Sequence, residues 1–337
     1  MDKICVNIII LNWNNSEDTI ACLKSIQYLR DVRYRIILVD NGSNKGEYNT
    51  VLQWVNHNFE NIQVIEKVSD KEQFNNVKGS EEQGRESITI IRNLENYGFA
   101  KGNNIGIRYC LKFWKNDYVL LLNNDTEVEP DSIGKLVNFL EEHPNYQAAT
   151  PQIRYYKPND VIWNCGGNIN WYKRRVYDYA ETKISEVPQE GNKEITFITG
   201  CALLFKPVGC GLLSEKFFFG EEDFEFSLRM KKQQKKMACL YSSVIYHKVG
   251  RSIEKSSGMK GRVVLFYLNR LINLRNYVNP LFWMVLYTVS LLYAFVLLTV
   301  KYRCGIYSSL QAIKSIAIGA VKMNGVNKDM FLKAKAL

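Results

Sequence analysis

Three short apolar runs, each followed directly by polar residues, limit the fold of this chain more than any other feature. They occupy residues 4–11, 35–39 and 118–122 and consist mainly of isoleucine, leucine and valine. Continuous apolar strands are buried on both faces, which requires a mostly parallel sheet covered by helices. A helix-forming segment, residues 16–29, separates the first two runs, as in a β-α-β unit that binds a nucleotide. We therefore expect an α/β, Rossmann-like fold.

The same patterns predict further elements along the chain. An amphipathic helix is expected over residues 131–142, and strands over residues 87–91, 196–205 and 237–246. Residues 66–86 are rich in Glu, Lys, Gln, Asn and Ser, which predicts a surface insertion without a chemical role.

The cysteines and the amino terminus bear on the cellular compartment. The 8 cysteines are scattered, without a CxxC pair or the spacing of a zinc site, which predicts reduced thiols in the cytosol. The first apolar run is too short for a signal peptide and is expected to be a strand.

Charge is unevenly distributed. Residues 226–337 contain 19 Lys and Arg against two acids, Glu254 and Asp329, whereas the whole chain has a net charge of +10. The first 225 residues are therefore acidic. A basic segment of this kind indicates an anionic partner, either nucleic acid or the phosphate-rich surface of a membrane, although a solvated face is the simpler explanation.

The carboxyl-terminal third contains a long apolar run. Residues 281–300 are uncharged, and a helix of this length matches a bilayer's hydrocarbon thickness of about 30 Å. Residues 262–279 and 306–321 resemble helices that lie in a membrane interface. The apolar run would either span the bilayer, dock in its plane or mediate dimerisation, which would make the chain a homo-oligomer. We expect a catalytic domain over residues 1–255 and a membrane-associated helical region over residues 256–337.

Polar clusters stand at the ends of the three apolar runs. They are Asn12 to Asn15, Asp40 to Ser43 and Asn123 to Asp125. Each alone is explained by ordinary turn chemistry. Because the carboxyl ends of parallel strands form the ligand crevice of an open sheet, three together predict a binding site.

Five segments in order resemble glycosyltransferase family 2, particularly its rhamnosyltransferase-like branch. They are NIIILNWNN, ILVDNGS, NLENYGFAKGNNIGI, LLLNNDTEVEPD and FFGEEDFEFSLR, and the resemblance runs from about Val6 to His247. It implies a GT-A fold and an enzyme that transfers a sugar from a nucleotide donor with inversion at the anomeric carbon.

The resemblance also implies a nucleotide site at the strand ends. Asp40 would accept a hydrogen bond from the imide N–H of uracil or thymine, so the donor would be a UDP- or dTDP-sugar. Lys101 would reach the diphosphate, although a loop followed by a helix cap is the alternative interpretation of residues 96–104. The other nucleotide-binding residues expected are Asn12, Asn14, Asn41, Asn96, Gly98, Asn103 and Asn124.

A metal site is implied by Asn123-Asn124-Asp125, which occupies the place of the family's Asp-x-Asp. The cofactor would be Mg²⁺ or Mn²⁺, which prefers oxygen ligands. Because the neutral amide of Asn123 binds metal weakly, Asp125 would provide most of the coordination. His247 has two alternative roles, a further metal ligand or a structural histidine, and the sequence does not favour either.

The acidic cluster at residues 221–225 carries the expected base. The resemblance assigns Asp223 as the group that deprotonates the acceptor hydroxyl. Glu222, Glu225 and Gly200 would line the acceptor pocket, with the two glutamates also holding Arg229. The alternative is an acidic first turn that complements a helix dipole.

Together these observations predict an inverting hexosyl- or rhamnosyltransferase at the cytoplasmic face of the cell membrane. Its acceptor would be a glycan or a lipid-linked precursor in cell-surface polysaccharide synthesis. A sugar nucleotidyltransferase would need a glycine-rich, basic signature near the amino terminus, which is missing. A nucleic-acid-binding protein would not surround 20 apolar residues with its basic groups, so no nucleic acid is expected as a partner.

Overall fold

The computed structural model describes residues 5–71, 74–75, 77, 87–114, 117–249 and 258–335. Its first part alternates strands and helices, and five strands pair in parallel in the order β5-β1-β2-β4-β3. The three apolar runs form β1, β2 and β5, as predicted. The elements of this part are β1 (Cys5–Asn12), α1 (Ser16–Ile26), β2 (Arg33–Asp40), α2 (Lys45–Asn58), β3 (Asn61–Val68), β4 (Ser87–Asn93), α3 (Phe99–Phe113) and β5 (Tyr118–Asn123).

The second part extends the same sheet and makes it mixed. Strand β12 pairs antiparallel with both β5 and β7, and β13 runs parallel to β7. Strands β9 and β10 form a separate hairpin. The elements are β6 (Thr126–Val128), α4 (Ser132–Glu142), β7 (Tyr146–Tyr155), β8 (Ile162–Asn164), β9 (Gly167–Ile169), β10 (Arg175–Tyr177), a 3₁₀ turn (Ile184–Glu186), β11 (Asn192–Ile195), β12 (Ala202–Phe205), α5 (Pro207–Cys210), α6 (Glu222–Lys232) and β13 (Lys236–His247).

One predicted strand is wrong in its extent. The sequence pattern gave a strand over residues 196–205, but only Ala202–Phe205 is one. The preceding residues form a turn that contains Gly200, beside which Cys201 accepts a hydrogen bond from the backbone N–H of Asn123 at 2.9 Å. Most of the insertion expected over residues 66–86 lies outside the described residues, apart from the end of β3 and the residues that follow it.

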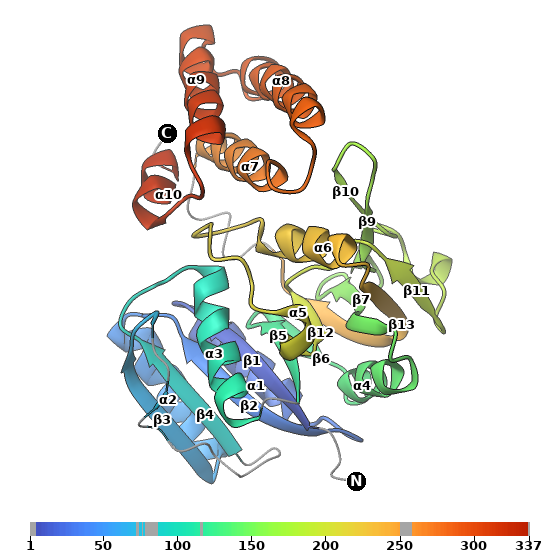
Figure 1. Ribbon diagram of the computed structural model, residues 1–337. Coiled ribbons are helices and arrows are strands. Elements are labelled where there is room, and N and C mark those ends of the chain that lie inside the picture. The colour runs from blue at the N-terminus through green and yellow to red at the C-terminus, as the bar shows by residue number, and fades with distance from the viewer. Residues whose placement is uncertain are drawn as a thin grey trace.

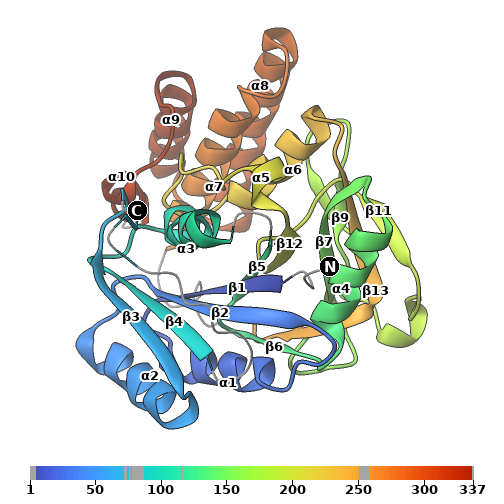
Figure 2. The ribbon, with the colours of Figure 1, turned by 60° about the horizontal axis from the view of Figure 1, so that its bottom comes forward.

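Helices cover both faces of the sheet (Figure 2). On one face, Ile8 and Ile10 of β1 pack with apolar residues of α1, α2 and α4. On the other, Ile9 packs with residues of α3 and α6. This alternation of side chains along one strand explains why the run is apolar throughout.

The carboxyl-terminal helices form a bundle with a core of its own (Figure 1). That core also contains Phe217, from the loop before α6, which pairs with Val326 through a parallel β-bridge. The described part of the region predicted over residues 256–337, residues 258–335, therefore packs against the α/β domain. The helices are α7 (Met259–Leu274), α8 (Pro280–Val296) with a π-helical extension (Leu297–Lys301), α9 (Ile306–Lys322) and α10 (Lys328–Lys335).

Among the described residues, one helix is long and apolar enough to cross a membrane. It covers Pro280–Lys301, 22 residues, in which an 18-residue stretch has a mean hydropathy of 2.2. Its partners within the bundle are α7 and α9, to which Trp283 Nε1 and Tyr287 Oη donate hydrogen bonds at the carbonyls of Leu271 and Ala317, at 2.9 and 3.2 Å.

Candidate functional site

The ends of β1 and β2 are joined by a buried polar network. Asp40 is 1% exposed, and its carboxylate accepts hydrogen bonds from Asn12 Nδ2 and the backbone N–H of Ser43, both at 3.1 Å. Burial raises the pKa of Asp40, although these donors oppose the rise. Asn14, in the left-handed region with φ of 50°, receives the hydrogen bond of Asn44 N–H at 2.8 Å. The network holds the first two polar clusters of the sequence together.

Asn41 connects this network to the loop before α3. Its amide donates to Asn96 Oδ1 and to the carbonyl of Gly98, both at 3.1 Å. Gly98 has a φ of 86°, and a Cβ there would lie 2.1 Å from the carbonyl oxygen of Phe218. A side chain at position 98 is therefore excluded, and this loop is held against the loop that precedes α6.

Two further residues predicted for the nucleotide site lie in the first turns of α3. Lys101 Nζ forms an ion pair with Asp70 Oδ2 at 2.9 Å, and both side chains are about one-third exposed. Asn103 is buried, and its amide donates to the carbonyl of Phe99 at 3.0 Å. The alternative interpretation of residues 96–104, a loop followed by a helix start, describes the backbone correctly. Lys101 must leave Asp70 to reach a phosphate.

Asp125 and His247 face each other at the end of β5. Asp125 Oδ1 lies 3.1 Å from His247 Nε2, and both side chains are buried. Within the described part of the chain, Asp125 Oδ1 and His247 Nδ1 are buried polar atoms that make no hydrogen bond of regular geometry. Unsatisfied buried oxygen and nitrogen atoms of this kind fit a divalent cation.

The other two residues of the motif precede Asp125 at the end of β5. Asn124 Nδ2 donates to Thr19 Oγ1 of α1 at 2.9 Å and lies 3.5 Å from Asn12 Oδ1. Asn123, half-buried, ends β5. The described residues include no group of three or more His, Cys, Asp and Glu side chains that could hold a metal ion. A metal at Asp125 and His247 would need ligands from a substrate or from water.

Asp223 stands at the start of α6 and faces a cation. Arg175 Nη1, from β10, lies 3.6 Å from Asp223 Oδ1. Burial raises the pKa of Asp223, and the Arg175 guanidinium acts against this rise. Burial and the adjacent Asp223 carboxylate raise the pKa of Glu222 to about 8. Paired acids with raised pKa values are typical of sites that exchange protons.

The remaining acids of the cluster are held by the chain itself. Glu221 accepts two hydrogen bonds from Arg270 of α7, at 2.7 and 2.8 Å, and both side chains are buried. Glu225 accepts from Arg229 Nε at 3.3 Å and from Tyr277 Oη. Arg229 is thus held by Glu225, as predicted.

The expectation that Glu222 also holds Arg229 is wrong. Arg229 directs its other nitrogens to the carbonyls of Cys210 and Leu212, and Glu222 Oε2 is buried without a hydrogen-bond partner among the described residues. Glu222 and Asp223 are therefore the members of the cluster whose carboxylates are not held by a close ion pair with Arg270 or Arg229.

The turn at Gly200 brings the two acidic centres together. A Cβ at position 200 would lie 3.8 Å from Cβ of Asp223 and 3.3 Å from the ring of Phe99. The next residue, Cys201, accepts the hydrogen bond from Asn123 described above. One short turn therefore touches the metal motif, the base candidate and the start of α3, which places the residues predicted from separate motifs in one site.

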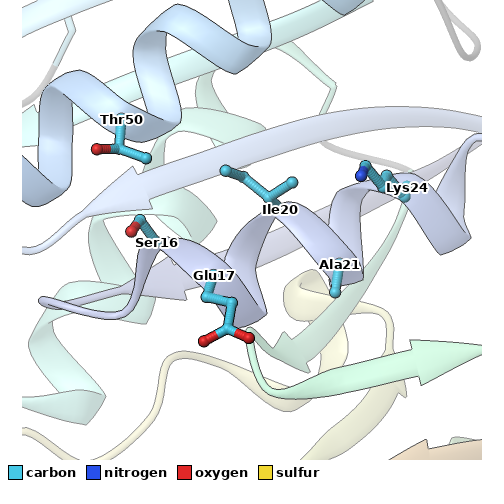
Figure 3. Close-up of a pocket in the computed structure, with 6 residues that line it drawn as sticks. All are labelled: Ser16, Glu17, Ile20, Ala21, Lys24 and Thr50. Atoms are coloured by element: carbon cyan, nitrogen blue, oxygen red, sulfur yellow. The ribbon is translucent and has the colours of Figure 1, made fainter.

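A depression elsewhere on the surface does not belong to this site. It has a volume of about 430 Å³ and lies between α1 and α2 (Figure 3). Helix side chains line it, and none of the predicted site residues is among them. Its lining residues are Ser16, Glu17, Ile20, Ala21, Lys24 and Thr50.

Sequence reasoning missed two functional candidates, Arg175 and Arg270. Arg175 lies within the run Trp171 to Arg175, where three consecutive basic residues follow two aromatic ones, and this density was the available indication. From the sequence, Arg270 is one basic residue of a predicted interfacial helix. Its partner Glu221 lies 49 positions away, so no local pattern indicates the pair.

Solved structures resemble this fold. A mannosyltransferase from Pyrobaculum calidifontis, determined with GDP-Man and Mn²⁺, has a TM-score of 0.53 at 13% identity and covers 95% of this chain and 74% of its own. GalNAc-T7, determined with UDP, GalNAc and Mn²⁺, has a TM-score of 0.51 at 16% identity over 73% of this chain and 44% of its own. S. aureus TarS 1–349 with UDP has a TM-score of 0.51 at 11% identity, covering 95% and 81%. The fold is GT-A.

Sequence comparison identifies the family. The low-salt glycan biosynthesis hexosyltransferase Agl10 of Haloferax volcanii is 26% identical over 148 residues, which is 44% of this chain and 36% of that protein. The match therefore spans about a third of the relative's length. The model of glycosyl transferase family 2 matches residues 7–208, more than half of the chain. The chain belongs to glycosyl transferase family 2.

Proposed function

We propose that the chain transfers a hexose from a nucleotide donor to an acceptor hydroxyl, with inversion at the anomeric carbon and Asp223 as the base. The observation that carries this proposal is the position of Asp223 at the start of α6, beside the Gly200 turn, whose next residue Cys201 contacts the metal motif. A single carboxylate with a raised pKa can take a proton from an alcohol during attack. Glu222, beside it, contacts the acceptor.

The donor binds along the ends of β1, β2 and β5. Asp40 and Asn41, with Asn12, order the nucleotide pocket, and Asp125 with His247 holds Mg²⁺ or Mn²⁺. The cation, when bound, neutralises the charge of the departing diphosphate. The neighbours determined with UDP or GDP-Man and Mn²⁺ support a nucleotide diphosphate donor. The hexosyltransferase Agl10 supports a hexose as the transferred sugar. The donor class expected from Asp40 is a UDP- or dTDP-sugar.

Helix α8 docks the enzyme on the cytoplasmic face of the membrane. One side of α8 packs on α7 and α9, and the other exposes an apolar stripe in which Leu281 and Val289 are 73% and 58% exposed. Lys301 and Arg303 follow the stripe, which suits an anionic lipid surface. Because α8 is fixed to α7 and α9, docking in the membrane plane is favoured over spanning. The acceptor is a glycan or lipid-linked precursor of a cell-surface polysaccharide.

The metal site tests the donor half of this proposal. Asp125→Ala should weaken Mn²⁺-dependent binding of UDP at least about tenfold more than Asn123→Ala, because only the aspartate supplies a charged ligand. Asn123→Asp should tighten Mn²⁺ binding, since it adds a second carboxylate. Calorimetric titration of UDP with and without Mn²⁺ measures both effects, and full transfer activity in excess chelator would contradict the proposal.

A further inference from the structure

The turn between β9 and β10 presents cations beside the proposed base. Lys173 and Arg174 lie in the turn, Arg175 follows as the first residue of β10, and Arg175 Nη1 lies 3.6 Å from Asp223 Oδ1. The turn is ordered by its backbone: Asn170 N–H donates to the Arg174 carbonyl at 3.0 Å, and Asn170 Oδ1 accepts from Arg174 N–H at 2.8 Å. The backbone that carries Lys173 and Arg174 is therefore fixed in the turn that precedes Arg175.

The turn lies against α6 and α7. Arg270 of α7 donates from Nη1 to the Lys173 carbonyl at 3.3 Å. Lys173 lies near Lys231 of α6, and burial together with this like charge lowers the pKa of Lys173. Among the described residues, Lys173, Arg174 and Lys231 have no carboxylate within ion-pair distance. An excess of positive charge that the protein itself does not neutralise fits an anionic ligand.

Aromatic side chains connect the turn to α8. Arg174 is close enough to Tyr267 of α7 to affect its ionisation, and the rings of Tyr267 and Tyr293 are 6.5 Å apart. Tyr293, on α8, is 51% exposed and borders the apolar stripe, and Trp171 at the tip of the turn is 78% exposed. Figure 1 shows the hairpin extending past α6 on the side of the helical bundle. Going outwards from the acid Asp223, the side chains are first the cations of the turn, then the aromatic rings of Tyr267 and Tyr293, and then the aliphatic residues of α8.

This order matches the chemistry of one class of acceptor. A sugar linked to a lipid through a diphosphate carries, in sequence, a hydroxyl, a doubly charged diphosphate and a hydrocarbon chain. We propose that the β9–β10 turn binds the diphosphate of such an acceptor, with Lys173 and Arg174 as phosphate ligands and α8 in contact with the lipid. The inference rests on the proposed function, because it uses Asp223 as the base.

The donor's diphosphate is not the ligand of this turn. The turn contacts α6 and α7, whereas the Asn123 to Asp125 motif contacts α1 and β13 through Thr19 and His247. Two diphosphates of opposite roles would thus be held on different sides of Asp223. The two cationic residues that would bind the acceptor, Arg174 and Lys173, lie one and two residues before Arg175, and neighbouring Cα atoms are about 3.8 Å apart. The diphosphate bound by the turn would therefore be attached to the acceptor sugar close to the hydroxyl that reacts.

The test is vesicle binding by the full-length protein without donor. Wild type should bind phosphatidylcholine vesicles containing a polyprenyl diphosphate more tightly than vesicles of equal charge containing phosphatidylglycerol. Lys173→Gln/Arg174→Gln should lose roughly tenfold in affinity for the first and at most about twofold for the second. Inorganic pyrophosphate should compete with the wild type on the diphosphate vesicles. The control is Lys24→Gln/Lys45→Gln, which removes the same charge from exposed positions on α1 and α2.

Three outcomes would overturn the inference. They are a wild type without preference for the diphosphate vesicles, a turn variant that binds them as wild type does, and a turn variant that loses equally on both vesicles. The last outcome would assign the turn to general headgroup attraction. UDP binding of the variant, measured separately, reports whether it is folded. Because no sugar is transferred in this assay, its failure is distinct from a failure of the proposed catalysis, which transfer assays report.

Discussion

At the scale of single residues, the charge around Asp223 determines the pH at which this proposed base is ionised. Its carboxylate is faced by Arg175 from β10 and Arg270 from α7, and by the acids Glu221 and Glu222 of its own cluster. Burial and the neighbouring acids favour the protonated form, whereas the arginines favour the ionised form. The balance is a raised pKa, and Arg175 is the nearer of the two cations that oppose it.

Replacing Arg175 should therefore change the pH dependence of transfer. Without the guanidinium, the pKa of Asp223 rises further, and the base is protonated at pH values where the wild-type base is free. For Arg175→Ala, the acidic limb of kcat against pH should move upward by about one pH unit, the low end of a charge effect because Arg175 is partly exposed. Arg175→Lys keeps the positive charge, so its acidic limb should lie close to that of the wild type. An unchanged acidic limb in the alanine variant would show that Arg175 does not act on the base.

At this scale, the sequence located charged residues better than their partners. Asp223, Asp125 and His247 were proposed from motifs, and the structure places Asp125 beside His247. The pairs Arg175–Asp223 and Arg270–Glu221 join residues 48 and 49 positions apart. Such pairs depend on how the β9–β10 hairpin and α7 pack on α6, which no local pattern records.

At the scale of elements, strong apolar runs were predicted well and mixed segments were not. β3 is an edge strand whose residues are mostly half-buried or exposed, so it has no continuous apolar run. The segment that forms α3 contains Gly102 and Gly106, which weaken a helix prediction. A Cβ on Gly102 would lie 2.6 Å from Leu11 Cδ1, so this glycine is required for the close packing of α3 on the sheet.

Helix α7 shows why the carboxyl-terminal region is more than an anchor. Its Arg270 holds Glu221 in a buried ion pair, and removing one partner of such a pair typically costs about 3–5 kcal/mol. Asn269 and Asn273 also donate to the carbonyls of Phe219 and Glu221, at 3.1 and 3.3 Å. The start of α6, where Asp223 stands, is therefore positioned by α7.

The exposed stripe of α8 is expected to bind the membrane. Val289→Glu should reduce the affinity for anionic vesicles about tenfold, because a valine leaves the lipid interface and a charge enters it. Val208→Glu, on α5, is a matched control, since Val208 is 56% exposed and Val289 58%. Vesicle flotation measures the bound fraction. Equal binding of both variants and wild type would show that α8 does not contact lipid.

At the scale of the whole molecule, the α/β domain and a basic helical bundle meet at one candidate site. The α/β domain contains the strand ends and the candidate metal motif, and the basic bundle supplies Arg270 and the exposed apolar helix. The candidate site lies where the two meet, so membrane docking by the bundle, as proposed above, would bring Asp223 close to a lipid-linked acceptor. The charge asymmetry was evident in the sequence, but the contact between the parts was not.

The central claim is that Asp223 removes the proton from the acceptor as the sugar is transferred. The most direct measurement is kcat of Asp223→Asn at saturating donor, with a membrane extract as the source of acceptor. The variant keeps the shape of the side chain and removes its basicity, so kcat should fall at least about a hundredfold while UDP binding and its metal dependence are unchanged. A kcat near that of the wild type would contradict the assignment of Asp223 as the base.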